Sequence, residues 1–197
     1  MTNKLKYTMI FIRHTNSLLL LNRVKPPLMG LWTGVGGKIE ANESPINGAL
    51  REVVEETGIT IHELSFNGTV KWHTENEDSG MYLFSCEIHD NAGYDKPKLV
   101  DEGILAWKGI GWVLHGTNYG IPKHIQLFLP SVLSGEVREH RCVFRNNELE
   151  KYEQVPLVHE NPAMTQTALI TGASSGIGYT YALLSGEKGY DVVIVGR

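Results

Sequence analysis

The sequence has few cysteines and no long apolar runs. Its 197 residues include only Cys86 and Cys142, which are too few for a disulfide framework and do not have metal-ligand spacing. No apolar run approaches the roughly 20 residues that a membrane-spanning helix needs, and residues 1–7 lack the apolar core of a signal peptide. We therefore expect a cytoplasmic protein that has no membrane partner.

The sequence also lacks an excess of positive charge. It contains 18 Lys and Arg against 22 Asp and Glu, a formal net charge of −4. This balance excludes a strongly basic chain that binds nucleic-acid polymers. The hydrophobic fraction of 42% and the charged fraction of 20% are typical of a globular protein. The length predicts one domain of about 150 residues followed by an additional segment.

Apolar patterning predicts a chain that is rich in strands. Strands are predicted at residues 7–13, 18–24, 66–73, 81–89, 104–107 and 137–144. A helix is predicted at residues 121–133, where Pro122 is tolerable in the first turn. The stretch that begins at Glu148 is charged and weakly patterned, so no strand is predicted there.

A second helix is predicted at residues 45–57, with a sequence signal at each end. Ser44 is a suitable N-cap, Pro45 suits the first helical position, and Gly58 is a typical stop. At about 100° per residue, the glutamates at positions 52, 55 and 56 share one side. The opposite side is apolar and consists of Ile46, Ala49, Leu50, Val53 and Val54. The like charges repel one another, and a hard divalent cation would neutralise them.

The glutamates belong to a longer pattern with fixed spacing. Gly37 is followed after five residues by Glu43, and after seven more by Arg51-Glu52-Val53-Val54-Glu55-Glu56-Thr57-Gly58-Ile59. This matches the box G-x5-E-x7-R-E-U-x-E-E-x-G-U, where U is apolar, and the chain therefore resembles the Nudix hydrolase superfamily. The resemblance implies an α/β/α sandwich with a mixed sheet over residues 1–155.

The same resemblance implies roles for these residues. Glu52, Glu55, Glu56 and the Gly37 carbonyl would bind Mg²⁺, with Mn²⁺ as an alternative, while Glu43 supports the site. A metal-activated water then attacks phosphorus in a nucleoside diphosphate linked to another group. Arg51 can hold the carboxylates in register. The choice of catalytic base among the glutamates stays open, as do the number of metal ions, the phosphorus attacked and the oligomeric state.

Residues 31–40 resemble the MutT-type branch, which removes oxidised purine nucleoside triphosphates. This favours hydrolysis of a nucleoside triphosphate, such as 8-oxo-dGTP, to the monophosphate and pyrophosphate. Thr33 stands where the branch has an asparagine that contacts the base, which leaves the base open. The alternatives are a hydrolase of ADP-ribose or dinucleoside polyphosphates, or a nucleotide-sensing module without turnover. Arg23, Trp32, Thr33, Lys38 and Tyr119 are candidate substrate residues, and Glu102 is a further candidate metal ligand.

Residues 156–163 read as a linker to a different segment, residues 164–197. There Thr171-Gly172-Ala173-Ser174-Ser175-Gly176-Ile177-Gly178, between predicted strands at 168–171 and 191–195 and before a predicted helix at 179–188, resembles the start of a short-chain dehydrogenase. The resemblance implies a partial Rossmann-like β-α-β fragment. The Tyr-x3-Lys pair of that family is absent from this segment, so an NAD(P)-linked oxidoreductase is disfavoured. We expect a truncated fragment, joined from a neighbouring reading frame.

Overall fold

The computed structural model describes residues 5–157, 167–171 and 191–195. The chain divides into two compact units, Met1–Glu160 and Asn161–Arg197, which are described separately. The boundary falls within the predicted linker at 156–163.

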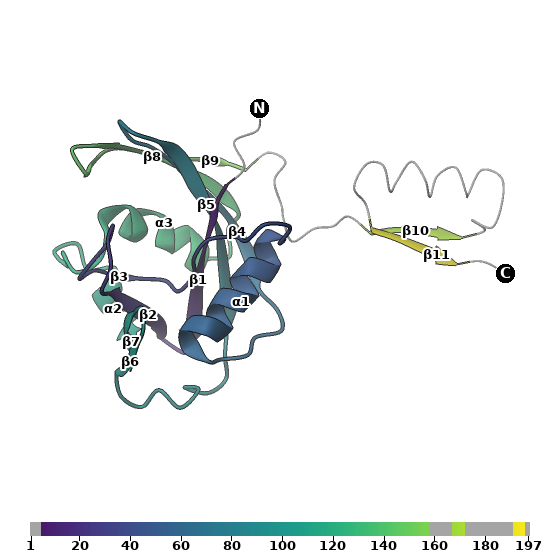
Figure 1. Ribbon diagram of the computed structural model, residues 1–197, viewed down its shortest axis with the longest axis horizontal. Coiled ribbons are helices and arrows are strands. Elements are labelled where there is room, and N and C mark those ends of the chain that lie inside the picture. Colours follow the sequence, from purple (N-terminus) through teal and green to yellow (C-terminus); the bar gives the residue numbers. More distant parts are fainter. Residues whose placement is uncertain (1–4, 158–166, 172–190, 196–197) are drawn as a thin grey trace. The chain divides into compact units, whose positions relative to one another are not determined.

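The first unit is built on a nine-stranded sheet (Figure 1). Its strand order is β6-β7-β2-β1-β5-β4-β8-β9, and the short β3 pairs with β2. β1 runs parallel to β5 and β4 runs parallel to β8, whereas the other pairs are antiparallel, so the sheet is mixed. The strands are β1 (Tyr7–His14), β2 (Ser17–Arg23), β3 (Trp32–Thr33), β4 (Ser65–His73), β5 (Asp78–Glu87), β6 (Lys98–Val100), β7 (Gly103–Gly109), β8 (Arg138–Arg145) and β9 (Glu148–Pro156).

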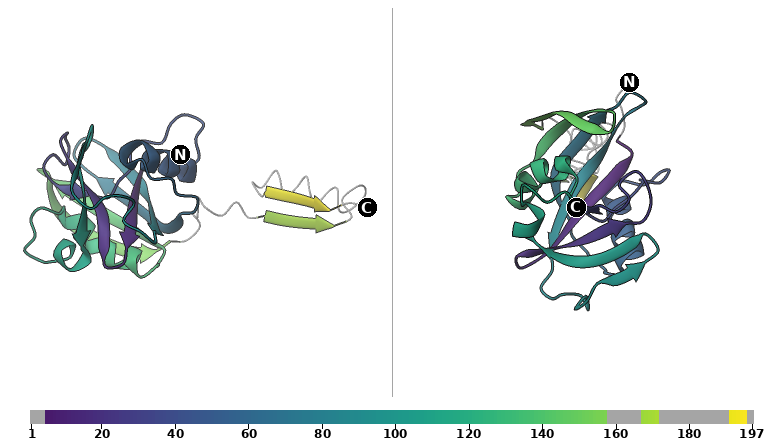
Figure 2. Two further views of the ribbon diagram at one scale, coloured as in Figure 1. Left: turned by 90° about the horizontal axis from the view of Figure 1, so that it is seen from below. Right: turned by 90° about the vertical axis from the view of Figure 1, so that its left-hand side faces the viewer.

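Helices cover both faces of this sheet (Figure 2). α1 (Pro45–Thr57) packs with Ile10 and Ile12 of β1, while α2 (Ile110–Val113) and α3 (Lys123–Leu133) pack with Met9 and Phe11 on the other face. The alternation of side chains along β1 therefore supplies both cores. The predicted α/β/α arrangement with a mixed sheet is confirmed. None of the helices in the described ranges has the length and apolarity needed to cross a membrane.

α1 has the predicted ends but a rotated buried face. The Asn47 amide donates to Ser44 Oγ at 3.3 Å, and Gly58 ends the helix in the left-handed region with φ 72°. The prediction that Val54 packs inward is wrong, because its side chain is 45% exposed. The buried stripe instead continues from Ala49 and Val53 to Glu56, which a wheel of apolar residues alone cannot indicate.

Four further elements are absent from the prediction, including the two-residue β3. β9 pairs antiparallel with β8, although the sequence predicts no strand there. Most of its side chains are exposed or half-buried, so it lacks the apolar alternation by which strands are recognised. β6 and α2 have three and four residues, which is too short for a periodic signal.

A fork between β1 and β2 positions the pocket. β1 pairs with β2 only through its last three residues, whereas Tyr7 bridges to Lys38 and Ile10 bridges to Val35. Residues 32–33 form β3 and pair with β2, and the chain then runs beside β1 as far as Lys38. At Gly36, φ is 135° and a Cβ atom would lie 2.4 Å from the Thr8 carbonyl oxygen. Only glycine permits this approach.

The second unit contributes two described strands. β10 (Thr167–Thr171) and β11 (Asp191–Val195) pair in parallel, with five residue pairs in register. They lie where strands are predicted at 168–171 and 191–195. The predicted glycine turn at 172–178 and helix at 179–188 fall outside the described residues, so the dehydrogenase-like fragment stays a prediction.

His140 is a buried titratable group beneath α3. It is fully buried in β8, with Nδ1 2.8 Å from the Tyr152 hydroxyl and Nε2 3.3 Å from Ser131 Oγ. Burial lowers the pKa of His140 to about 4, and the nearby charge of Arg138 acts in the same direction. The imidazole is therefore neutral in the folded protein at neutral pH.

We predict that His140 makes the fold sensitive to acid. The histidine pKa is about 6.5 in the unfolded chain, so its contribution is complete above that pH and is lost as the pH falls toward about 4. In urea titrations at several pH values, the free energy of unfolding of the wild type relative to His140→Gln should fall by about 2–3 kcal/mol between pH 7 and 4. The exposed His89→Gln serves as the control. A difference that does not change with pH would contradict the assignment.

Candidate active site

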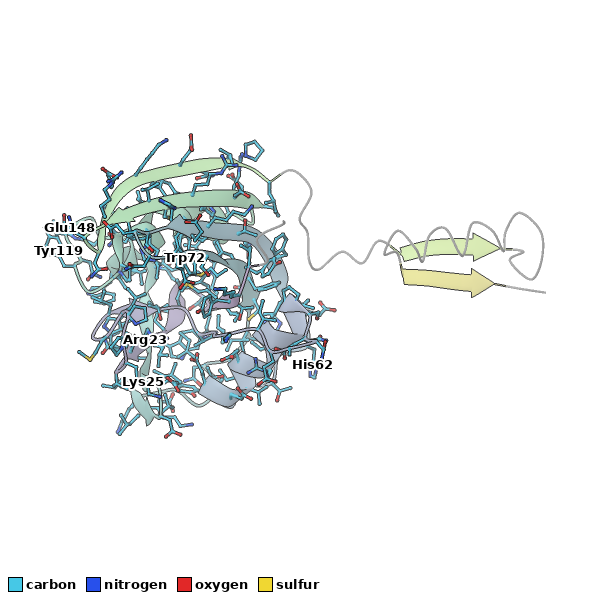
Figure 3. The ribbon with its side chains drawn as sticks, turned by 45° about the horizontal axis from the view of Figure 1, so that its top comes forward. Arg23, Lys25, His62, Trp72, Tyr119 and Glu148 are labelled. Atoms are coloured by element: carbon cyan, nitrogen blue, oxygen red, sulfur yellow. The ribbon has the colours of Figure 1, made fainter. Side chains whose placement is uncertain are left out.

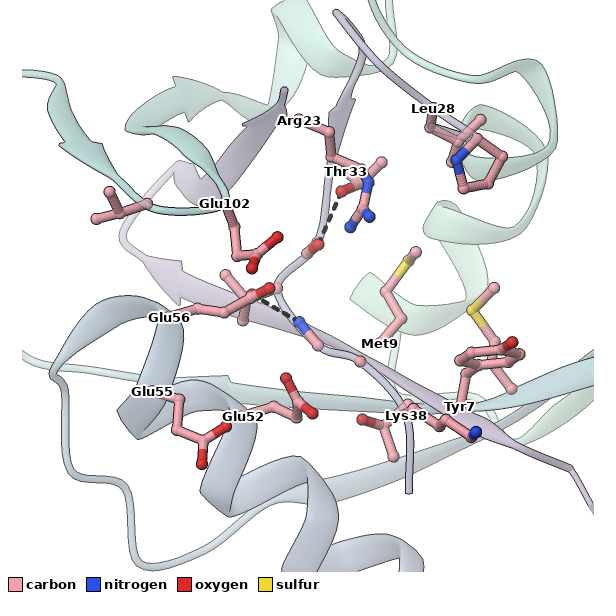
Figure 4. Close-up of a pocket in the computed structure, with 18 of the residues that line it drawn as sticks. Tyr7, Met9, Arg23, Leu28, Thr33, Lys38, Glu52, Glu55, Glu56 and Glu102 are labelled. Atoms are coloured by element: carbon pink, nitrogen blue, oxygen red, sulfur yellow. Dashed lines mark hydrogen bonds between the residues drawn. The ribbon is translucent and has the colours of Figure 1, made fainter. Parts of the chain in front are cut away.

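A pocket of about 940 Å³ opens where the fork, α1 and the turn after β6 meet. Figure 4 shows that its two ends differ in chemistry. Glu52, Glu55, Glu56 and Glu102 gather at one end, whereas the other end carries apolar side chains. That apolar end includes Tyr7, Met9, Pro27, Leu28, Trp72 and Met81.

Arg51 holds the acidic residues of α1 together. Its Nε donates to Glu43 at 3.0 Å, and its Nη1 donates to Glu52 at 2.9 Å and to Glu55 at 2.8 Å. Its Nη2 donates to the Lys38 carbonyl at 3.1 Å. The bond from Arg51 holds the pKa of Glu43 below its usual value, with help from the Glu40 amide. One guanidinium therefore offsets the repulsion within the cluster.

Glu52 and Glu56 are the more buried carboxylates of the helix. Glu56 is 9% exposed and accepts a hydrogen bond from the Gly36 amide at 2.9 Å. Burial raises the pKa of Glu56 to about 7, although the Gly36 bond opposes this shift. Burial also raises the pKa of Glu52, against the effect of its bond to Arg51. A Cβ atom at Gly37 would lie 2.6 Å from the Glu52 carboxyl group, so glycine makes room for that carboxylate.

The predicted metal ligands have suitable chemistry for a hard cation. They are oxygen donors, and Glu52 and Glu55 each bond Arg51 through one of their two oxygens. The Gly37 carbonyl already accepts the Thr8 amide at 2.8 Å, which occupies one of its lone pairs. Within the described ranges, no three acidic, histidine or cysteine side chains already converge on one point. Binding a metal would therefore require these carboxylates to reorient.

Glu102 reaches the pocket from the opposite side. It lies in the turn between β6 and β7, and its carboxylate bonds the Lys25 ammonium at 3.2 Å. The charge of Glu102 raises the pKa of Glu56, whereas Arg23 lowers it. Both groups therefore act on the buried end of the acidic cluster.

The structure divides the predicted substrate residues into two groups. Arg23, Thr33 and Lys38 line the pocket, whereas Trp32 and Tyr119 are not among the described lining residues. The Trp32 ring lies perpendicular to that of Trp112 at 6.5 Å, with the Lys108 ammonium 4.1 Å from its centre. Tyr119 is 87% exposed and lies at the outer edge of the domain (Figure 3).

The sequence reasoning missed the apolar wall of the pocket. Tyr7 and Trp72 have their rings 6.0 Å apart and stack at 28°, and Tyr7 is the register partner of Met81. Tyr7 and Met9 are two residues apart on one strand, so their side chains share a face of the sheet. This spacing is visible in the sequence. Trp72 comes from β4, and only the pairing of β4 with β5 brings it to the same place.

Comparisons with known proteins agree with this architecture. Over 115 residues the chain is 31% identical to the NAD-capped RNA hydrolase NudC of Haemophilus influenzae, covering 50% of this chain and 44% of that protein. It is 29% identical to the oxidized purine nucleoside triphosphate hydrolase of Danio rerio over 108 residues, covering 54% of this chain and 66% of that one. The chain thus spans less than half the length of NudC.

A solved structure, the MutT protein of Bacillus halodurans, superimposes with a TM-score of 0.60 at 25% identity. The match covers 75% of this chain and 95% of that one. The family model of the NUDIX domain matches residues 4–117, more than half of the chain. The match includes the glycine segment, α1 and Glu102, so the chain belongs to the NUDIX domain family.

Proposed function

We propose that the protein hydrolyses a phosphoric anhydride bond in a nucleotide. The observation that carries this proposal is the two-ended pocket, in which carboxylates gather at one end and an aromatic and thioether wall lies at the other. A nucleoside polyphosphate has the same two-part chemistry, because its charged phosphate chain binds a divalent cation and its base is a planar ring with largely apolar faces. The favoured reaction releases a nucleoside monophosphate and pyrophosphate from a nucleoside triphosphate.

At the acidic end, Arg51 holds the carboxylates while the Gly36 amide orients Glu56. Mg²⁺ or Mn²⁺ bound by Glu52, Glu55 and Glu56 would neutralise phosphate charge and activate a water near neutral pH. Glu56, which the Gly36 amide orients, is one candidate base, and Glu52, Glu55 and a metal-bound hydroxide are the alternatives.

Arg23 supports a position for phosphate between the two ends. It lines the pocket, and its buried Nε has no hydrogen-bond partner among the described residues. The positive charge of its guanidinium group would attract a phosphate. Lys38 lies on the pocket wall as a second cation.

The apolar end supports a site for the base. Tyr7 and Trp72 provide aromatic surface, and Met9 and Met81 provide polarizable surface that adapts to ring shape. The Thr33 hydroxyl donates to the Gly34 carbonyl at 2.9 Å, so its hydrogen is not available to a base. One candidate substrate is 8-oxo-dGTP. ADP-ribose and dinucleoside polyphosphates are the alternatives, along with nucleotide sensing without turnover.

Turnover should depend on the carboxylates at the acidic end of the pocket. With Mg²⁺ present, the wild type should convert one member of a panel of 8-oxo-dGTP, dGTP, ATP, ADP-ribose and diadenosine tetraphosphate. Glu56→Gln should lower kcat by at least about 100-fold, because the amide neither binds a cation well nor accepts a proton. Glu63→Gln, which changes an exposed glutamate, is the matched control. Nucleotide binding without turnover of any panel member would instead favour the sensing module.

Substitution of single aromatic residues should show which ring stacks on the base. Trp72→Leu should raise KM for the preferred nucleotide by about 10-fold, since base stacking contributes about 1–3 kcal/mol. Tyr119→Leu should leave KM within twofold, because its ring lies outside the pocket. Steady-state kinetics on both variants, with melting temperatures measured in parallel, decide the matter. The reverse pattern would restore Tyr119 as the stacking residue.

A further inference from the structure

An ion pair joins the loop after β2 to the turn between β6 and β7. Lys25 Nζ lies 3.2 Å from Glu102 Oε1, and the side chains are 60% and 37% exposed. The Val24 amide also donates to the Glu102 carbonyl at 3.1 Å. The backbone bond keeps this loop beside Glu102, so the ammonium is held near the carboxylate even if the ion pair opens.

Lys25 belongs to the loop that also carries pocket-lining residues. Arg23 precedes it by two positions, and Pro27 and Leu28 follow it, and all three line the pocket. Figure 3 shows Arg23 and Lys25 in the same part of the domain. Glu102 in turn influences the buried Glu56. Lys25 is not itself among the described lining residues, but its ammonium contacts the pocket carboxylate Glu102 and it lies two positions from Arg23.

We propose that Lys25 is a positioning residue that exchanges partners: it holds Glu102 before the divalent cation binds and pairs with the polyphosphate chain afterwards. This proposal rests on the proposed function. A divalent cation and an ammonium compete for the same carboxylate oxygens, so binding the cation at Glu102 would release Lys25. The incoming phosphate chain provides a new anionic partner within reach of the same loop.

The chain contains a closely matched ion pair for comparison. Lys6 Nζ lies 3.2 Å from Glu77 Oε1, with side chains that are 51% and 52% exposed. Glu77 also lines the pocket, but it lies in the turn between β4 and β5 rather than on α1 or beside Lys25. Removal of Lys6 changes the net charge by the same amount and breaks an equivalent bond. It therefore controls for the general field of a lysine near the pocket.

The experiment first measures Mn²⁺ affinity without nucleotide, by calorimetry at low ionic strength. Lys25→Ala should bind Mn²⁺ about two to five times more tightly than the wild type, in proportion to the worth of an exposed ion pair. Lys6→Ala should differ from the wild type by less than this. The gain should disappear at high salt, which screens the competing pair. It should also disappear in a Glu102→Gln background, as a double-mutant cycle requires.

The second measurement is the affinity for a non-hydrolysable nucleoside triphosphate analogue with Mn²⁺ present. Lys25→Ala should weaken it at least threefold, Lys25→Arg should restore it, and melting temperatures should stay unchanged. Unaltered or weaker Mn²⁺ binding in Lys25→Ala overturns the proposal, as does a gain that persists with Glu102→Gln. Unchanged analogue affinity overturns the transfer to phosphate. Wild-type turnover of the nucleotide panel tests the proposed function separately.

Discussion

The close approach of residues 34–38 to β1 is the constraint on which the site depends. This approach holds β1 and β2 apart, and the pocket lies in the fork between them. The same segment directs the Gly36 amide at Glu56 and leaves space beside Gly37 for the Glu52 carboxylate. A side chain at Gly36 would strike the backbone of β1 at Thr8. The sheet and the acidic helix thus approach each other at Gly36 and Gly37, which have no Cβ atoms.

The charges of the site are balanced locally before any ligand arrives. Arg51 pairs with the exposed Glu55 and with the more buried Glu43 and Glu52. Glu56 is not among the hydrogen-bond partners of Arg51 and is held instead by the Gly36 amide, which carries no full charge. Burial therefore dominates its pKa, which reaches about 7. The pKa is thus lowered at Glu43, which Arg51 holds, and raised at the buried Glu56.

The sequence predicts the acidic end of the site better than the apolar end. Glu52, Glu55 and Glu56 lie on one helix, so spacing alone places them together. The apolar wall combines Tyr7 from β1 with Trp72 from β4, and β5 lies between these strands. Such a juxtaposition depends on sheet order and register, which have no local signal. For the same reason, the sequence alone does not indicate that Tyr119 lies outside the described lining of the pocket.

The unequal ends of the pocket also restrict the orientation of a ligand. A phosphate chain placed against Met9 and Met81 would lose its hydration without gaining a hydrogen-bond donor, which is unfavourable for a charged group. The proposed function therefore favours the orientation with phosphates toward α1, where a bound cation would offset their charge. Arg23 lines the pocket and would add a positive charge beside them.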